Sequence, residues 1–159
     1  MNDRFKFRVW SKQSNSYIKD KMFYIDRFGG LFKYEKSKST VYINADSPYV
    51  MCLCGDRYVC EQCTGLRDKN GKLIYEGDIV RESPYNKYFE YADYVVSWKD
   101  GAYTNEKCLC MKNKETGEIK DCSKGGYCFS KHIHQEEADD FEVIGNIHEN
   151  ANLLEVDDD

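Results

Sequence analysis

The residues with the clearest chemical potential are eight cysteines, which fall into two groups along the chain. A tetrahedral zinc site needs four soft or borderline ligands, and a Cys-x-x-Cys turn supplies two of them. The spacing therefore predicts either a structural zinc ion or free thiols that pack as small apolar side chains. The first group is Cys52, Cys54, Cys60 and Cys63, and the second is Cys108, Cys110, Cys122 and Cys128.

Catalytic chemistry has little support in the sequence. A thiol nucleophile needs a neighbouring base and an electropositive setting. His132 and His134 are the only bases close to a cysteine in sequence, and they lie in a polar stretch rather than at a rigid strand end. The carboxylates form no recognisable acid–base pair, and the two Gly-Gly pairs lack the pattern of a phosphate loop. We therefore expect a protein that is not an enzyme.

Charge is unevenly distributed along the chain. The net charge is −5, but residues 1–40 carry ten Lys or Arg against four acids, whereas residues 133–159 carry ten acids and no Lys or Arg. This asymmetry indicates mutual attraction, charged partners, a decoy for basic surfaces, or simply solvated surface. Basic and aromatic residues alternate near the N-terminus and could bind nucleic acid, but the sequence pI of about 5.3 argues against that function.

The sequence also indicates a cellular compartment. Four of the first eight residues are charged, unlike the apolar stretch of a signal peptide. No stretch approaches the roughly 18 apolar residues of a transmembrane helix. We therefore expect the protein to be made and kept in the cytosol without membrane contact. Cysteines stay mostly reduced there, so disulfides are not expected.

Short strands joined by tight turns account for most of the sequence. The alternation of apolar and charged residues from Phe5 to Val9 predicts a half-buried strand, and Asn70-Gly71 predicts a type I′ turn. The many aromatic residues and only two prolines favour pleated structure throughout. The pattern predicts an all-β protein built as a small barrel or roll. Further strands are expected at residues 22–25, 41–43, 58–63, 72–75, 79–81, 91–98, 102–111 and 141–147.

Three segments together resemble the YopX family of phage and prophage proteins. The central one, TGLRDKNGKLIYEGDIV at residues 64–80, closely resembles the core signature of that family. FKFRVW at residues 5–10 is similar to its N-terminal strand, and FEVIGNIHEN at residues 141–150, followed by Leu153-Leu154, to its C-terminal strand. The sequence departs from the family pattern at Ala151, where proline is common, and in its cysteine-bearing segments.

The resemblance implies an SH3-like barrel in the C-terminal part, preceded by a smaller β region, and it brings no catalytic residues. It also implies that Cys60 and Cys63 lie in a strand, where they would face opposite sides, so a zinc site would need a turn at Glu61-Gln62. Within the signature, Asp68, Asn70 and Asp78 can accept bonds from neighbouring backbone amides and thereby fix the turns.

Residues and resemblance together predict three regions. Residues 1–62 form an N-terminal β region, residues 63–155 form the SH3-type barrel with a cysteine-bearing insertion at about 104–135, and residues 156–159 form an acidic disordered tail. Tyr85 and Tyr88 follow the signature in a loop and are the candidate binding residues, because tyrosine offers a large contact area with a polar tip. Tyr91 and Tyr94 are expected to be strand residues half in the core.

The expected function is non-enzymatic. The protein would bind a host or phage protein in the host cytoplasm, with self-association as a further expectation. The alternatives are a counter-defence protein that binds a small ligand or nucleotide, and a nucleic-acid-binding module. No cofactor is expected apart from the candidate structural zinc.

Overall fold

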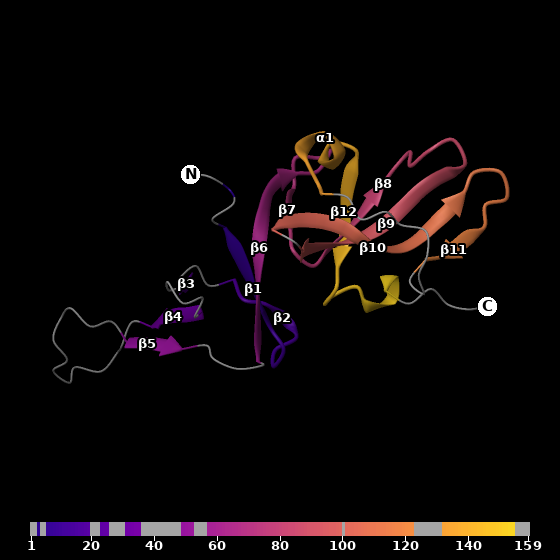
Figure 1. Ribbon diagram of the computed structural model, residues 1–159. Helices are drawn as coiled ribbons and strands as arrows, with labels where there is room; N and C mark the ends of the chain where they lie inside the picture. Colours follow the sequence, from indigo (N-terminus) through magenta and orange to yellow (C-terminus); the bar gives the residue numbers. More distant parts are fainter. Residues whose placement is uncertain are drawn as a thin grey trace. The chain divides into compact units, whose positions relative to one another are not determined.

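The computed structural model describes residues 3, 6–19, 23–25, 31–35, 49–52, 57–99, 101–122 and 132–154, and these are almost entirely strands (Figure 1). Helical structure in these ranges is limited to one turn of α-helix, α1 (Gln135–Ala138), a 3-10 turn, η2 (Ala151–Leu153), and Asp3 in 3-10 conformation. The predicted all-β class is therefore confirmed. The chain divides into two compact units: one is Arg8–Cys60, and the other joins Met1–Phe7 to Glu61–Asp159.

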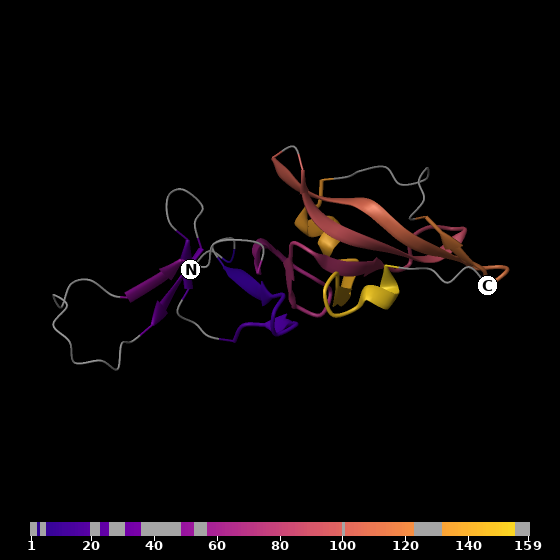
Figure 2. The same ribbon diagram turned by 90° about the horizontal axis from the view of Figure 1, so that it is seen from below.

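A five-stranded antiparallel sheet is the main sheet of the larger unit. Its order is β11 (Ile119–Asp121), β10 (Ala102–Asn113), β9 (Phe89–Lys99), β8 (Asp78–Glu82) and β12 (Phe141–Asn146). The β9–β10 pairing shifts register three times, and bulges of this kind bend a strand and increase its twist. The sheet consequently curls into a half-barrel, as the long curved β9 and β10 show (Figure 2). The SH3-like topology expected for this part of the chain stays a prediction.

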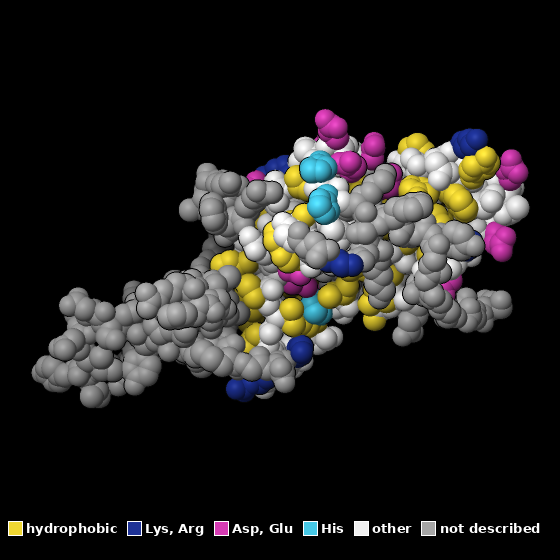
Figure 3. Space-filling view, in the orientation of Figure 1, with side chains coloured by type: hydrophobic (Ala, Val, Ile, Leu, Met, Phe, Trp, Pro, Cys, Tyr) yellow, Lys and Arg dark blue, Asp and Glu magenta, His cyan; other side chains and the backbone are white. Residues whose placement is uncertain are grey.

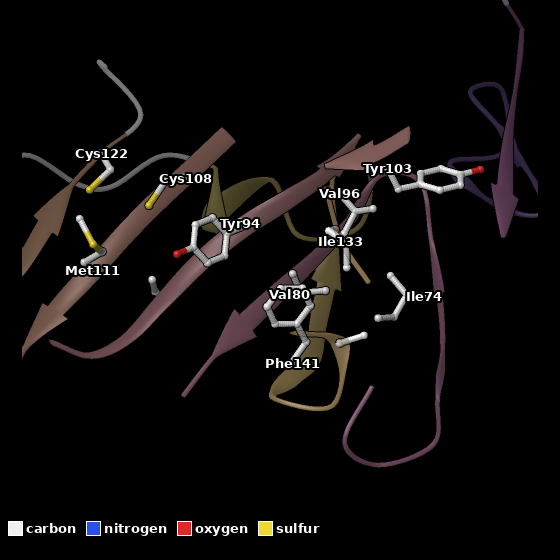
Figure 4. Packing of buried hydrophobic residues seen from close by; sticks show 12 residues of the cluster. Ile74, Val80, Tyr94, Val96, Tyr103, Cys108, Met111, Cys122, Ile133 and Phe141 are labelled. Carbon is white, nitrogen blue, oxygen red and sulfur yellow. The ribbon is translucent and has the colours of Figure 1, made fainter. Parts of the chain in front are cut away.

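Both faces of this sheet carry buried apolar side chains. One cluster packs residues of β7 (Leu73–Tyr75), β8, β9, β10 and β12 with α1. Phe141 (1% exposed) and Tyr94 lie at its centre with ring centroids 6.5 Å apart (Figure 4). A second cluster on Ile79, Val95 and Leu109 is covered by Ile144, Ile147, Leu153 and Leu154. Burial on both faces explains why these strands read as apolar runs and not as strict alternation.

The signature region forms the turns predicted from its polar residues, with one correction. Strand β6 (Tyr58–Arg67) leads into β7 (Leu73–Tyr75), and between them Asp68 Oδ1 accepts bonds from the amides of Asn70 (2.9 Å) and Lys72 (2.8 Å). Asp78 likewise accepts a 2.8 Å bond from the amide of Tyr75. Gly71 has φ +78°, but Asn70 does not have a positive φ, so the predicted type I′ turn is wrong. That turn type needs positive φ at both central residues.

The smaller unit is built from short antiparallel pairs. Strands β1 (Phe7–Ser11) and β2 (Ser16–Tyr17) pair through Trp10 and Tyr17, whose rings meet edge to face at 5.0 Å. A separate sheet has the order β3 (Phe23–Ile25), β4 (Leu31–Glu35) and β5 (Tyr49–Cys52). The strand predicted at residues 41–43 and the tail at residues 156–159 lie outside the described residues. Within the part of the chain described, no helix is long and apolar enough to cross a membrane.

Candidate functional site

A cavity of about 340 Å³ opens in the larger unit between three segments that are distant in sequence. Strand β6 contributes Gln62, Cys63, Thr64 and Leu66, and the β9–β10 hairpin contributes Trp98, Gly101, Ala102 and Tyr103. Residues 132–135, which lead into α1, close the third side. This volume falls at the lower end of the range of known ligand pockets. We refer to it as the Trp98 pocket.

Backbone hydrogen bonds hold the pocket walls in place. Tyr103 pairs with Trp98 across the hairpin, and the Tyr103 carbonyl accepts a 2.9 Å bond from the amide of Ile133. A β-bridge joins Thr104 to His132 beside this bond. The Gln135 side chain donates a 3.0 Å bond to the carbonyl of Arg67 at the end of β6. The pocket is therefore a built part of the fold, because main-chain bonds tie the hairpin to residues 132–133 and the Gln135 side chain ties α1 to β6.

Two aromatic rings define the chemical character of the pocket. The Trp98 side chain is 53% exposed although it is large and apolar. Its ring meets that of the buried Tyr103 edge to face, with centroids 4.8 Å apart. Aromatic pairs prefer this geometry, so Tyr103 holds the indole in a fixed orientation while leaving much of it open to a partner.

The pocket also places a cysteine close to two histidines, but the thiol is not activated. Cys63 is fully buried, and this burial raises the pKa of its thiol, opposed in part by the Gly65 amide that donates to the sulfur. A catalytic cysteine needs the opposite shift, since the thiolate is the nucleophile. His132 and His134 are exposed at the rim. The arrangement therefore favours binding over thiol chemistry.

The comparisons with known proteins bear on the whole chain. The sequence model described as YopX protein matches residues 6–155. The chain belongs to the YopX family. Among solved structures, the chain is similar to a crystal structure of protein EF1440 from Enterococcus faecalis, with 24% sequence identity, a TM-score of 0.46, and coverage of 94% of this chain and 97% of that one. No curated protein matches the chain.

The predicted family is thus confirmed, and part of the segment on which the resemblance rested builds the pocket. Thr64 and Leu66, in the first residues of the signature, line the cavity. The Thr64 hydroxyl donates a 2.9 Å bond to the carbonyl of Ile74 and accepts a 3.0 Å bond from the amide of Leu66. These bonds fix the register of β6 against β7 at the point where β6 forms a pocket wall.

The cysteines of the first group do not show the turn that a zinc knuckle requires. Cys60 and Cys63 lie in one continuous strand, β6, in which Glu61 between them is buried and Gln62 is exposed. The chain therefore does not turn at Glu61-Gln62. Cys54 and the side chain of Cys52 lie outside the described residues, so a metal site that includes them stays a prediction.

The second group is dispersed between the core and one face of the sheet. Cys108 and Cys122 lie beside Met111 at one end of the buried cluster (Figure 4). Cys110 donates a 3.5 Å bond to Asp93, and burial together with the Asp93 carboxylate raises the pKa of this thiol to about 12. Across the described ranges, no set of three or more His, Cys, Asp or Glu side chains could hold a metal ion. Cys128 lies outside those ranges.

The two tyrosines expected to bind a partner have different environments. Tyr88 is 59% exposed, in agreement with a position at a loop rim. Tyr85 packs on the core, with its ring centroid 6.4 Å from that of Phe89 and 6.3 Å from that of Tyr94. Tyr94 is buried and Tyr91 is half-buried, as expected for strand residues. Neither Tyr85 nor Tyr88 lines the Trp98 pocket.

Trp98 is the residue that sequence reasoning missed. The sequence pattern predicts only that Trp98 ends the strand at residues 91–98. A sequence signal did exist, because Trp98 directly precedes the turn residues Lys99-Asp100-Gly101. An aromatic residue at a hairpin tip projects beyond the sheet and has few neighbours to cover it, which makes it a candidate contact residue.

Proposed function

We propose that this YopX-family protein acts by binding a protein partner in the Trp98 pocket, without catalysing a reaction. Its setting would be the cytoplasm of a bacterial host that carries the phage or prophage encoding it. The observation that carries the proposal is the exposed indole of Trp98, held against Tyr103 over a cavity of about 340 Å³.

Protein interfaces concentrate their binding energy on a few such residues. Tryptophan is enriched at these positions because its ring buries a large area at a small entropic cost, and the energetic centres lie in well-packed pockets. Here Gln62, Gln135 and the two histidines supply polar groups around the aromatic pair. That composition suits a peptide side chain with its flanking backbone.

The residues that line the pocket argue against the alternative that this protein binds a nucleotide. Nucleotide sites depend on Lys, Arg or helix N-termini for their phosphates. Among the described residues, no Lys or Arg lines the cavity. The helix start that reaches it, at His134 and Gln135, belongs to the single turn α1, whose first turn carries the acidic Glu136 and Glu137 and therefore disfavours a phosphate. Catalysis is disfavoured by the raised pKa of the Cys63 thiol. The proposed activity is therefore recognition of a protein segment.

The test compares two exposed apolar residues. Trp98→Ala removes the indole, whereas Ile119→Ala removes a side chain of similar exposure (50%) on β11, away from the pocket. Each tagged protein is used for affinity capture from a host lysate, and recovered proteins are quantified by mass spectrometry. We expect one partner to be recovered by the wild type and by Ile119→Ala, and to be lost with Trp98→Ala.

A second measurement guards against misassignment. The partner is purified, and its affinity for each variant is measured by calorimetry, with a loss of at least about tenfold expected for Trp98→Ala. Unchanged affinity would show that the partner does not bind in the Trp98 pocket. Native mass spectra of protein purified from its host give a further check. A small molecule that is bound to the wild type and absent from Trp98→Ala would overturn the protein-partner proposal.

A further inference from the structure

Four carboxylates lie next to the Trp98 pocket. Glu136, Glu137, Asp139 and Asp140 follow directly after His134 and Gln135, which line the cavity. The Gln135 side chain donates a 2.7 Å bond to Asp139, so this carboxylate is one side chain away from the pocket wall. Figure 3 shows acidic side chains gathered over α1, beside histidine side chains.

No cation of the described residues neutralises this cluster. None of the four carboxylates forms an ion pair with a described Lys or Arg, and Glu137 bonds only the amide of His134 at the start of α1. The neighbouring cations are engaged elsewhere: Arg67 pairs with Asp3 at 2.7 Å, and Lys69 pairs with Glu142 at 2.7 Å. Residues 133–159 contain no Lys or Arg at all. Among the described residues, the pocket therefore opens beside a negative surface that no Lys or Arg neutralises.

Resting on the proposed function, we infer that the partner presents a segment with an arginine that stacks on Trp98 and faces the α1 carboxylates. An exposed indole attracts a cation over its face, and the planar guanidinium both stacks on aromatic rings and pairs with carboxylates. The pocket lining offers this group aromatic surface and no competing described cation. Each feature alone admits several partners, but together they select a basic peptide.

The same charge argument excludes polyanionic partners at this site. Nucleic acids and anionic lipid headgroups bind through Lys and Arg that neutralise phosphates, and the described part of this surface presents the opposite sign. Attraction between opposite charges also speeds association, and this effect weakens as salt screens it. The inference therefore predicts both a charge preference and a salt dependence.

The probes are four twelve-residue peptides with a Gly/Ser background. Each peptide carries the same residue at four positions, and this residue is arginine, lysine, glutamate or citrulline. Citrulline retains the shape of arginine without its charge. Binding to the full-length, ¹⁵N-labelled protein is followed through the indole N–H signals. The chain has two tryptophans, so Trp98→Phe assigns one signal and Trp10 serves as the internal reference. We expect the arginine peptide to shift the Trp98 signal, the citrulline and glutamate peptides not to, and affinity to fall with added salt.

A charge variant makes the test specific. Glu136 and Asp140 make no side-chain bond that holds α1, so E136Q/D140N removes two charges at little cost to folding. This double substitution should lower the affinity for the arginine peptide about threefold or more. E115Q/E118Q, in the exposed β10–β11 turn, should leave that affinity unchanged. Equal binding of the arginine and citrulline peptides, or equal binding by both double variants, would overturn the inference. If Trp98→Ala abolishes partner binding but the arginine peptide does not shift the indole signal, the Trp98 pocket remains the proposed binding site and the inferred arginine-bearing segment is wrong.

Discussion

At the scale of single residues, Gly77 shows how a missing side chain makes room for a buried contact between a carboxylate and an imidazole. Glu61 is buried in β6, and its carboxylate lies 2.9 Å from the imidazole of His148, beyond β12. A Cβ on Gly77 would stand 2.5 Å from the same carboxylate oxygen and 3.3 Å from Ile147. A side chain at position 77 would therefore push the Glu61 carboxylate away from its contact with His148.

Gly77→Ala is expected to destabilise the protein more than Gly71→Ala. Both glycines have φ +78°, so both substitutions incur the same left-handed backbone cost of about 1 kcal/mol. Only Gly77 is crowded, and the buried Glu61 cannot move without losing its bond to His148, which adds about 1–3 kcal/mol. Gly71 has nothing within 4 Å of the added Cβ and is the matched control. The free energy of unfolding is measured in urea, and equal losses would contradict this account.

At the scale of elements, the loop between β8 and β9 separates a packing residue from an exposed one. The Asn86 side chain accepts bonds from the amides of Tyr88 (2.8 Å) and Phe89 (2.9 Å) and so shapes the loop. This geometry turns Tyr88 outwards, whereas Tyr85 packs beside Phe89 and Tyr94. A binding role for this loop can therefore be tested cleanly only on Tyr88.

Tyr85→Ala and Tyr88→Ala should differ in stability. Removing the half-buried Tyr85 ring takes away two aromatic contacts and leaves space beside the core, at a cost of about 2–3 kcal/mol. Tyr88→Ala should stay within about 0.5 kcal/mol, as is usual for exposed positions. Thermal unfolding of the two single variants checks this difference. A large loss with Tyr88→Ala would mean that its ring is packed in solution.

At the scale of the whole molecule, three of the described cysteines are buried and contribute to packing. Cys63, Cys108 and Cys122 are 0%, 3% and 7% exposed. Buried thiols of this kind behave as small apolar side chains. Their separation between β6, β10 and the residue after β11 leaves no described group of ligands that could close around one ion.

We expect chelation to leave the melting temperature unchanged to within about one degree. A structural zinc ion contributes its binding free energy to folding, so its removal would lower the melting temperature clearly. Protein produced without added metal is analysed for zinc and then unfolded with and without EDTA. Zinc near one equivalent per chain, with loss of stability on chelation, would instead assign a site to the cysteines outside the described residues.

The sequence by itself determined the family, the all-β class and the turns of the signature. These features depend on local chemistry. The Asp68 and Asp78 carboxylates bond amides two to four residues away, and Gly71 supplies a positive φ that few other residues adopt. The turn type was wrong because the φ of Asn70 is set by the whole turn and not by its residue type.

Only the tertiary structure decided which side chains form a site. The Trp98 pocket joins residues 62–66, 98–103 and 132–135, and these segments meet because β9 and β10 curl and because Ile133 bonds to Tyr103. Exposure was equally undetermined, since Tyr85 and Tyr88 are the same residue type in the same loop. What distinguishes them is packing against Phe89 and Tyr94, and that contact exists only once the sheet has formed.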